Sequence, residues 1–145
     1  MITKEQKITK YCCLYASDFH LEMILLPYIK NKMYKSNVIV FTENNLKDSL
    51  KILLERTNLK LEDKNEIMNI KNWNTVKFKE KYKENEEYTI IINGNNDYRN
   101  KIHKELENMP NCKINTIDCY DLNKTDINRE KLQSEYERCL NTVAL

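Results

Sequence analysis

The sequence predicts an α/β fold: a single-domain, three-layer sandwich in which helices cover both faces of a four-stranded, mainly parallel sheet. Short runs that are apolar at every position alternate with longer amphipathic runs along the chain. Strands that alternate with helices favour parallel pairing, and continuously apolar runs are typical of strands buried on both faces. With 145 residues, 41% of them hydrophobic, the chain is long enough for one domain, 1–145, with a substantial core.

The charge is nearly balanced, with 24 basic and 22 acidic residues and a formal net charge of +2. This balance supplies no electrostatic drive toward nucleic acid or a membrane surface. No apolar run reaches the ~20 residues of a membrane-spanning helix, and the N-terminus lacks the apolar core of a signal peptide. We therefore expect a cytoplasmic protein. Its five cysteines include no CxxC pair, and we expect reduced, mostly buried thiols at Cys12, Cys13, Cys112, Cys119 and Cys139.

The first strand is predicted at residues 11–16, and a helix follows it from Asp18 to about residue 35. The side chain of Ser17 or Asp18 can cap this helix, because either can accept a hydrogen bond from the free amides of the first turn. Pro27 falls well inside the helix. Proline in a helix interior removes a backbone donor at a cost of about 3 kcal/mol. We expect a kink there, or a helix in two pieces.

The second strand is predicted at residues 37–42, which are β-branched and continuously apolar. Leucines at helical spacing then predict a helix from residue 46 to about residue 58. Asp63 is followed three residues later by Glu66, a pattern that resembles a capping box and predicts a short helix.

A stretch rich in lysine, glutamate and asparagine follows, with Trp73 among its few large side chains and a predicted surface helix at residues 75–83. The third strand is predicted at residues 88–92. The turn after it contains Gly94, the single glycine of the chain.

The last third of the chain predicts a helix, a strand and a second helix. Asn96 or Asp97 caps the first helix, whose apolar face carries residues 98, 102, 106 and 109. The fourth strand, residues 113–120, is expected at an edge of the sheet because Asn115 and Asp118 interrupt its apolar character. The final helix is predicted from residue 126 to residue 141.

Polar side chains gather where the predicted strands end. Because the carboxyl ends of parallel strands meet at one edge of the sheet, these side chains can form a polar cleft that binds a small ligand by hydrogen bonds. Capping and turn formation are the alternative role for the same residue types. The predicted ligand-binding residues are Ser17, Asp18, His20, Glu43, Asn44, Asn95, Tyr120 and Asp121, with Thr42, Asn93 and Asn96 beside them.

Other chemistry is disfavoured. A chain with one glycine cannot contain GxGxxG or GxxxxGK[ST], so a dinucleotide or nucleoside-triphosphate site of the usual kind is excluded. Glu43 ends the second strand where a receiver domain would need its acceptor aspartate. His20, Glu22 and His103 lack metal-ligand spacing, and His103 is expected on the solvated surface. We predict no cofactor and no metal.

The first strand and helix also carry a resemblance. Cys13, Leu14 and Tyr15 precede a polar break, Glu22 lies early in the helix, and a Leu-Pro-Tyr-Ile run follows at 26–29. This order resembles the opening of the methanogen/methylotroph sensory domain, known from a dichloromethane-responsive regulator. Residues 119–121, Cys-Tyr-Asp, are similar to the closing strand of that family. The resemblance implies a P-loop-like or Rossmann-like fold without a phosphate loop, and a non-catalytic sensor of small organic ligands in bacterial signalling.

Three functions follow from these observations. The leading one is a sensory or regulatory domain that binds a small molecule or a signalling protein at the carboxyl edge of the sheet. The second is a small enzyme that depends on Cys119 or His20. The third is a protein–protein interaction module that docks through Trp73, with a homodimer as one form of it.

Overall fold

A computed structural model of the chain describes residues 7–70, 85–108, 112–123 and 129–140. Strands and helices alternate along most of its length, as the hydrophobic pattern predicts. In chain order the elements are β1 (Lys7–Tyr15), α1 (Asp18–Lys32), β2 (Asn37–Thr42), α2 (Lys47–Glu55), α3 (Leu61–Asn69), β3 (Glu87–Asn93), α4 (Asn96–Leu106), β4 (Lys113–Asp121), α5 (Arg129–Glu135) and β5 (Arg138–Leu140).

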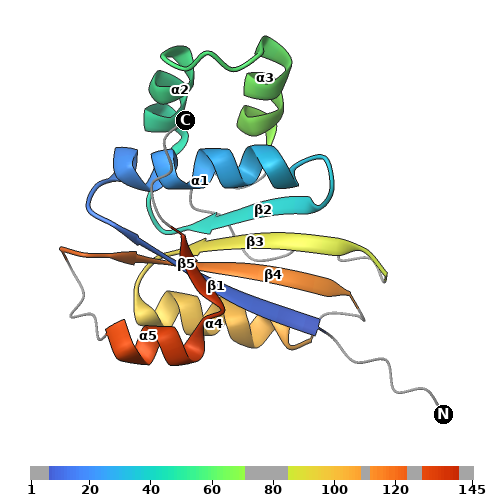
Figure 1. The fold of residues 1–145 in the computed structure, drawn as a ribbon, viewed down its shortest axis with the longest axis vertical. Helices are drawn as coiled ribbons and strands as arrows, with labels where there is room; N and C mark the ends of the chain where they lie inside the picture. The colour runs from blue at the N-terminus through green and yellow to red at the C-terminus, as the bar shows by residue number, and fades with distance from the viewer. Residues whose placement is uncertain (1–6, 71–84, 109–111, 124–128, 141–145) are drawn as a thin grey trace.

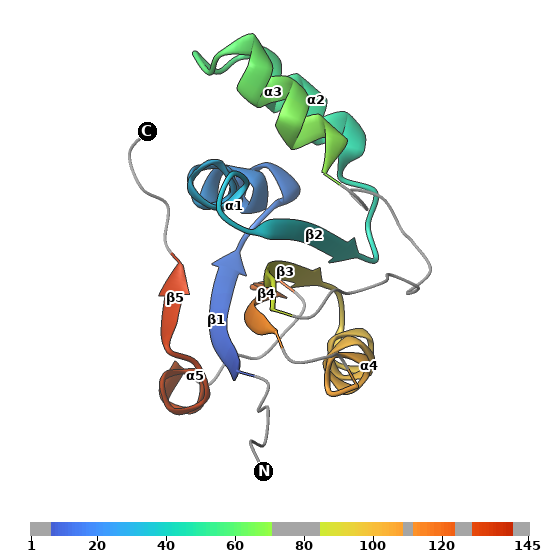
Figure 2. The same cartoon turned by 90° about the vertical axis from the view of Figure 1, so that its right-hand side faces the viewer.

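The strands form one sheet in the order β2-β3-β4-β1-β5, and every neighbouring pair is parallel. Helix α1 covers one face of the sheet, and α4 and α5 cover the other (Figure 1). Helices α2 and α3 lie beyond α1, side by side (Figure 2). The predicted α/β class is therefore confirmed, with the difference that the sheet has five strands and not four.

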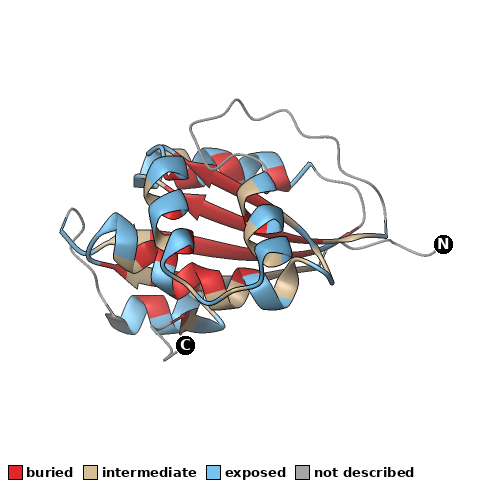
Figure 3. Cartoon of the chain, turned by 90° about the horizontal axis from the view of Figure 1, so that it is seen from above, coloured by how far each residue is buried: buried red, intermediate tan, exposed pale blue. Residues whose placement is uncertain are grey.

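Each face of the sheet has its own apolar core. On the α1 face, Val40, Ile91 and Ile117 of the strands pack with leucines of α1 and α2. On the opposite face, Phe41 and other strand residues pack against Ile102 and further apolar residues of α4. Figure 3 shows the resulting pattern, with buried strands beneath helices whose outer sides are exposed. Burial on both faces explains why these strands are apolar at consecutive positions.

Strand β4 lies between β3 and β1, so its predicted place at an edge is wrong. The two polar residues that prompted the edge prediction, Asn115 and Asp118, are 5% and 4% exposed. A central strand tolerates a polar side chain when other elements supply its hydrogen-bond partners, and Asp118 has partners on both sides, His103 and Tyr136.

The last predicted helix is also wrong in part, because within its described residues the helix ends at Glu135 and residues 138–140 form the fifth strand. The Tyr136 amide makes the last helical bond, to the Leu132 carbonyl (3.0 Å), and the Glu137 amide then donates to the Lys10 carbonyl of β1 (2.8 Å). A strand of three residues is too short to show an alternation that distinguishes it from a helix.

The fifth strand brings two cysteines together as a disulfide. Cys139 of β5 lies opposite Cys12 of β1 in register, and the two form a disulfide with their Cα atoms 4.6 Å apart. The prediction of reduced thiols is therefore wrong for this pair, because spacing along the chain does not show that residues 127 positions apart meet in the sheet. Cys13, Cys112 and Cys119 are free thiols and buried, as predicted.

The starts of α1, α3 and α4 test the capping residues predicted from the sequence. Ser17 caps α1, which continues through Pro27 as one helix. Asp63 lies inside the first turn of α3 instead of capping it, so the capping box is wrong. Asn95, and not Asn96 or Asp97, caps α4.

Other expectations fall outside the described residues: Trp73, the surface helix at 75–83 and Met109. Within the described residues, no helix is both long and apolar enough to cross a membrane.

Candidate functional site

The carboxyl ends of three strands are joined by a chain of buried side-chain hydrogen bonds. The Tyr15 hydroxyl at the end of β1 donates to Asn93 Oδ1 at the end of β3 (2.8 Å). Asn93 Nδ2 donates to Thr42 Oγ1 at the end of β2 (3.1 Å). Burial, with the nearby Cys119, Asp121 and Asp18, raises the pKa of Tyr15 well above its usual value, so the phenol keeps its proton. This chain rigidifies the edge where the sequence predicts a ligand.

Ser17 and His20 meet at the start of α1. Ser17 Oγ accepts from the His20 amide (3.1 Å), which is the cap of the helix. His20 Nδ1 in turn accepts from the Ala16 amide (2.9 Å). Asp18 occupies the first turn of the same helix, where a negative charge is favourable. These predicted ligand residues therefore have defined structural roles in this turn.

Glu43, directly after β2, and Asn95, the N-cap of α4, are brought together. Glu43 Oε1 accepts from the Asn95 amide (2.6 Å), and Asn95 Oδ1 caps α4 by accepting from the Tyr98 amide (2.8 Å). Gly94 is required beside them, because a Cβ there would lie 2.5 Å from Glu43 Oε1 and 2.5 Å from Tyr98 Cδ1. The glycine thus allows the end of β2 to lie close to the β3–α4 turn, and it is not needed to bind a phosphate.

The remaining predicted ligand residues, Asn44, Asp121 and Tyr120, do not lie in one cluster. The Asn44 amide donates to Thr42 Oγ1 (3.2 Å), and Asp121 Oδ1 accepts from the Asn123 amide (2.9 Å). Both are turn contacts at the ends of their strands. Tyr120 belongs to a different cluster, on the face covered by α4 and α5.

That second cluster is centred on Asp118. His103 Nε2 lies 2.7 Å from Asp118 Oδ1, and the Tyr136 hydroxyl donates to Asp118 Oδ2 (2.6 Å). The hydroxyls of Tyr120 and Tyr136 are 2.6 Å apart. Since Tyr136 gives its only hydroxyl proton to Asp118, Tyr120 must be the donor to Tyr136. Burial and the adjacent carboxylate raise the pKa of Tyr136 far above its usual value, which keeps this donor protonated.

Arg99 closes the cluster from α4. Its guanidinium lies over the Tyr120 ring, 4.0 Å from the centroid, and Nη1 donates to the Cys119 carbonyl (3.2 Å) and to the Gly94 carbonyl. Nη2 donates to Asn96 Oδ1. Arg99 is 4% exposed, so its charge is stabilised by carbonyl dipoles and a π face.

The sequence contains a local signal for this cluster in the spacing of its residues. Arg99 and His103 are four residues apart, which places them on one helix face. Asp118 and Tyr120 are two apart, which places them on one strand face. What spacing cannot show is that α4 packs beside β4 so that these two faces meet. His103, expected on the solvated surface, is half-buried and bonded to Asp118.

A buried carboxyl group lies between α1 and α2. Glu22 is 0% exposed, accepts from the Ser49 hydroxyl at Oε1, and has no hydrogen-bond partner for Oε2 among the described residues. Burial raises the pKa of Glu22 from 4.5 to about 7. The hydrogen bond from Ser49 lowers this pKa, and the nearby charge of Asp18 raises it further. Burial thus favours the protonated form of Glu22 above the pH at which an exposed glutamate ionises.

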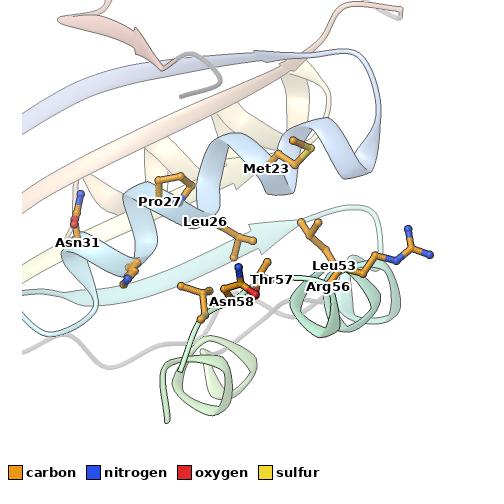
Figure 4. A pocket seen from close by; sticks show the side chains of 10 residues that line it. Met23, Leu26, Pro27, Asn31, Leu53, Arg56, Thr57 and Asn58 are labelled. Carbon is orange, nitrogen blue, oxygen red and sulfur yellow. The ribbon is translucent and has the colours of Figure 1, made fainter. Parts of the chain in front are cut away.

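A groove of about 580 Å³ runs between α1, α2 and the segment after α2. Figure 4 shows Leu26 of α1 and Leu53 of α2 on its opposite sides, with Arg56 extending outward. Its volume falls in the range of small-molecule sites. The apolar lining residues are Met23, Leu26, Pro27, Leu53 and Leu59. The polar ones are Lys30, Asn31, Arg56, Thr57 and Asn58.

Two features give this groove a chemical character. The described residues that line it include two cations, Lys30 and Arg56, and no carboxylate. Pro27 has no amide hydrogen, so the Met23 carbonyl lacks its usual helical donor. The groove therefore offers an apolar lining and two positive charges.

The described residues contain no group of three or more His, Cys, Asp or Glu side chains placed to hold a metal ion. Comparison of the chain with protein-family models, with curated proteins and with solved structures finds no match.

Proposed function

We propose that this chain is a non-catalytic sensory or regulatory domain that binds a small organic ligand with an apolar body and an anionic group. The observation that carries the proposal is the groove between α1 and α2, which combines a ligand-sized volume of about 580 Å³ with an apolar lining and the cations Lys30 and Arg56. The apolar body would occupy the groove and the anionic group would pair with one of the cations.

The groove is a better supported location than the carboxyl edge of the sheet predicted from the sequence. At that edge, Ser17, Glu43 and Asn95 are engaged in caps and turn contacts. A ligand there would have to replace these internal hydrogen bonds. A ligand site at the carboxyl edge stays a prediction. The resemblance to the methanogen/methylotroph sensory domain implies the same class of function and also stays a prediction.

The alternative of a cysteine enzyme has less support. A nucleophilic cysteine needs a stabilised thiolate and access to solvent. Cys119 is fully buried, and burial together with Cys13 and Asp118 raises the pKa of its thiol. His20 holds the turn at the start of α1 through Nδ1. The interaction-module alternative rests on Trp73, which lies outside the described residues.

The test is a binding series with straight-chain carboxylates from hexanoate to dodecanoate, each paired with the alcohol of equal length. We expect the longer carboxylates to raise the thermal midpoint, because a ligand at a hundredfold excess over its Kd adds about 2.7 kcal/mol of stability. The alcohols should bind more weakly, since they cannot pair with Lys30 or Arg56.

Matched variants locate the site. Leu53→Glu places a carboxylate in the groove and should abolish binding, whereas Ile52→Glu alters a neighbouring α2 residue that is 44% exposed and does not line the groove. Arg56→Gln should weaken the carboxylates more than the alcohols. Binding that survives Leu53→Glu would move the ligand elsewhere, and equal affinity for acids and alcohols would remove the anionic group from the proposal.

A further inference from the structure

The disulfide between β1 and β5 joins a central strand to a short edge strand. Strand β5 has three residues, paired with Tyr11, Cys12 and Cys13 of β1. Leu140 anchors its end in the core on the α1 face. Among the described residues, the Cys12–Cys139 bond therefore adds a covalent attachment to the backbone pairing of β5 and the Leu140 contact.

The two sulfurs of this bond differ in access. Cys12 is 0% exposed. Cys139 is half-buried and lines a cavity of about 420 Å³ between α5 and β5, together with Leu14, Leu132 and Tyr136. Exchange with an external thiol proceeds by attack along an open path to one sulfur. Cys139 borders such a path, whereas Cys12 is fully buried.

The two sulfurs also differ in electrostatic surroundings. Cys12 lies opposite Asp118 of β4 in register. Residues opposite one another on neighbouring strands point to the same face, and the next pair along, Cys13 and Cys119, shares the core on the α1 face. Cys12 and Asp118 are therefore neighbours on the other face, where His103 and Tyr136 hold the carboxylate in place.

We propose that Cys12–Cys139 is a reversible thiol–disulfide exchange site that accepts electrons from a dithiol entering the cavity beside α5, with Cys139 as the attacked sulfur and Cys12 as the leaving sulfur. This site is separate from the groove between α1 and α2, and the exchange does not depend on the function proposed for that groove.

The exchange balances in two steps. A thiolate of the dithiol attacks Cys139 Sγ, a new S–S bond forms there, and the bond to Cys12 Sγ breaks. The electron pair leaves on Cys12 Sγ, which takes up a proton because the neighbouring Asp118 disfavours a second negative charge. The second thiol of the reagent then attacks its own bonded sulfur and releases Cys139. The dithiol becomes a cyclic disulfide, and its two protons end on the two cysteines.

Reduction has a structural consequence. Without the disulfide, the described part of β5 is held by the backbone pairing of its three residues and by the Leu140 side chain in the core. A short edge strand with so few contacts opens locally more readily than the rest of a sheet. We expect the amides of residues 138–140 to exchange faster with solvent deuterium in the reduced protein, while those of β3 and β4 remain protected.

The decisive experiment compares the reaction rates of the two cysteines one at a time. Cys12→Ser leaves Cys139 as a free thiol, and Cys139→Ser leaves Cys12. We expect native Cys12→Ser protein to form a mixed disulfide with an aromatic disulfide reagent about tenfold faster, or more, than Cys139→Ser protein, because access controls the rate. Cys112→Ser, a buried cysteine outside the pair, is the control and should retain the wild-type disulfide.

The wild-type chain supplies the second arm. Native protein treated with dithiothreitol should gain two alkylatable cysteines, Cys12 and Cys139 by peptide mapping, and lose both after the dithiol is replaced by its oxidised form. Alkylation of both before any reduction would overturn the proposal, and so would reduction that requires denaturant. Equal or faster reaction of Cys12 than of Cys139 would reverse the assignment of the attacked sulfur. Circular dichroism of each serine variant shows whether its fold is intact.

Discussion

Replacing Glu22 with glutamine should remove a pH dependence of stability that the wild-type chain carries. The carboxyl group is buried between α1 and α2, with Ser49 as its hydroxyl donor and no partner for Oε2 among the described residues. Burial raises its pKa from 4.5 to about 7. The folded state therefore holds the proton more tightly than the unfolded state.

The sign and size follow from proton linkage. Because the unfolded chain releases this proton near pH 4.5 and the folded chain near pH 7, unfolding becomes easier as the pH rises between these values. At about 1.36 kcal/mol for each unit of pKa difference, the loss is about 3 kcal/mol by pH 8. Glutamine keeps the shape of the protonated side chain and does not titrate. The variant should therefore gain about 3 kcal/mol relative to wild type between pH 4.5 and pH 8.

Urea unfolding at half-unit pH steps measures this difference. Every other carboxyl group titrates in both proteins, so its contribution cancels when the two curves are subtracted. Glu55→Gln removes an exposed carboxylate from α2 and measures the effect of a lost surface charge. Only the pH-dependent part of the Glu22→Gln difference is diagnostic, since a buried amide also has a constant cost.

A flat difference curve from pH 4.5 to pH 8 would refute the reasoning, because it would mean that Glu22 ionises alike in the folded and unfolded chains. A difference that levels off well below pH 7 would show that burial raises the native pKa of Glu22 by less than the structure implies. Wild-type stability that increases over this interval relative to the variant would reverse the sign.

Three further predictions concern single contacts. Ser49→Ala removes the hydroxyl that favours the ionised form of Glu22, so the native pKa of Glu22, followed by carboxyl NMR, should rise, and an unchanged or lower value would contradict this. Gly94→Ala places a Cβ 2.5 Å from two side-chain atoms and should lower the free energy of unfolding by about 1–3 kcal/mol in urea, whereas a neutral result would show that the turn can move. Asp118→Ala leaves the Tyr136 hydroxyl without its acceptor and should lower the free energy of unfolding by about 3 kcal/mol, and a loss under 1 kcal/mol would show that water replaces the carboxylate.

The class of fold could be predicted from the sequence because it rests on local signals. Strands β2 and β3 are apolar at almost every position, since both faces of each are covered, and their bounds match the prediction closely. Ser17 at the start of α1 is equally local, because a cap depends on residues three positions apart.

The strand order and the candidate sites were decided by tertiary contacts. In the sequence, Asp118 interrupts the apolar character of its strand and so predicts an edge position. In the structure, His103 and Tyr136 form hydrogen bonds to its carboxylate in the middle of the sheet. The end of the predicted last helix becomes β5 because β1 offers an unpaired edge there. The groove between α1 and α2 arises from the packing of two helices that are each regular on their own.

The sequence by itself thus determined which segments become strands or helices for most of the chain, that the class is α/β, and that a glycine-based phosphate loop is excluded. Those properties depend on residues near one another in the chain. The tertiary structure alone decided that Cys12 meets Cys139, that Glu22 is buried beside Ser49, and that Lys30 and Arg56 line one groove. Each of these depends on how elements distant in sequence pack, and no spacing along the chain encodes it.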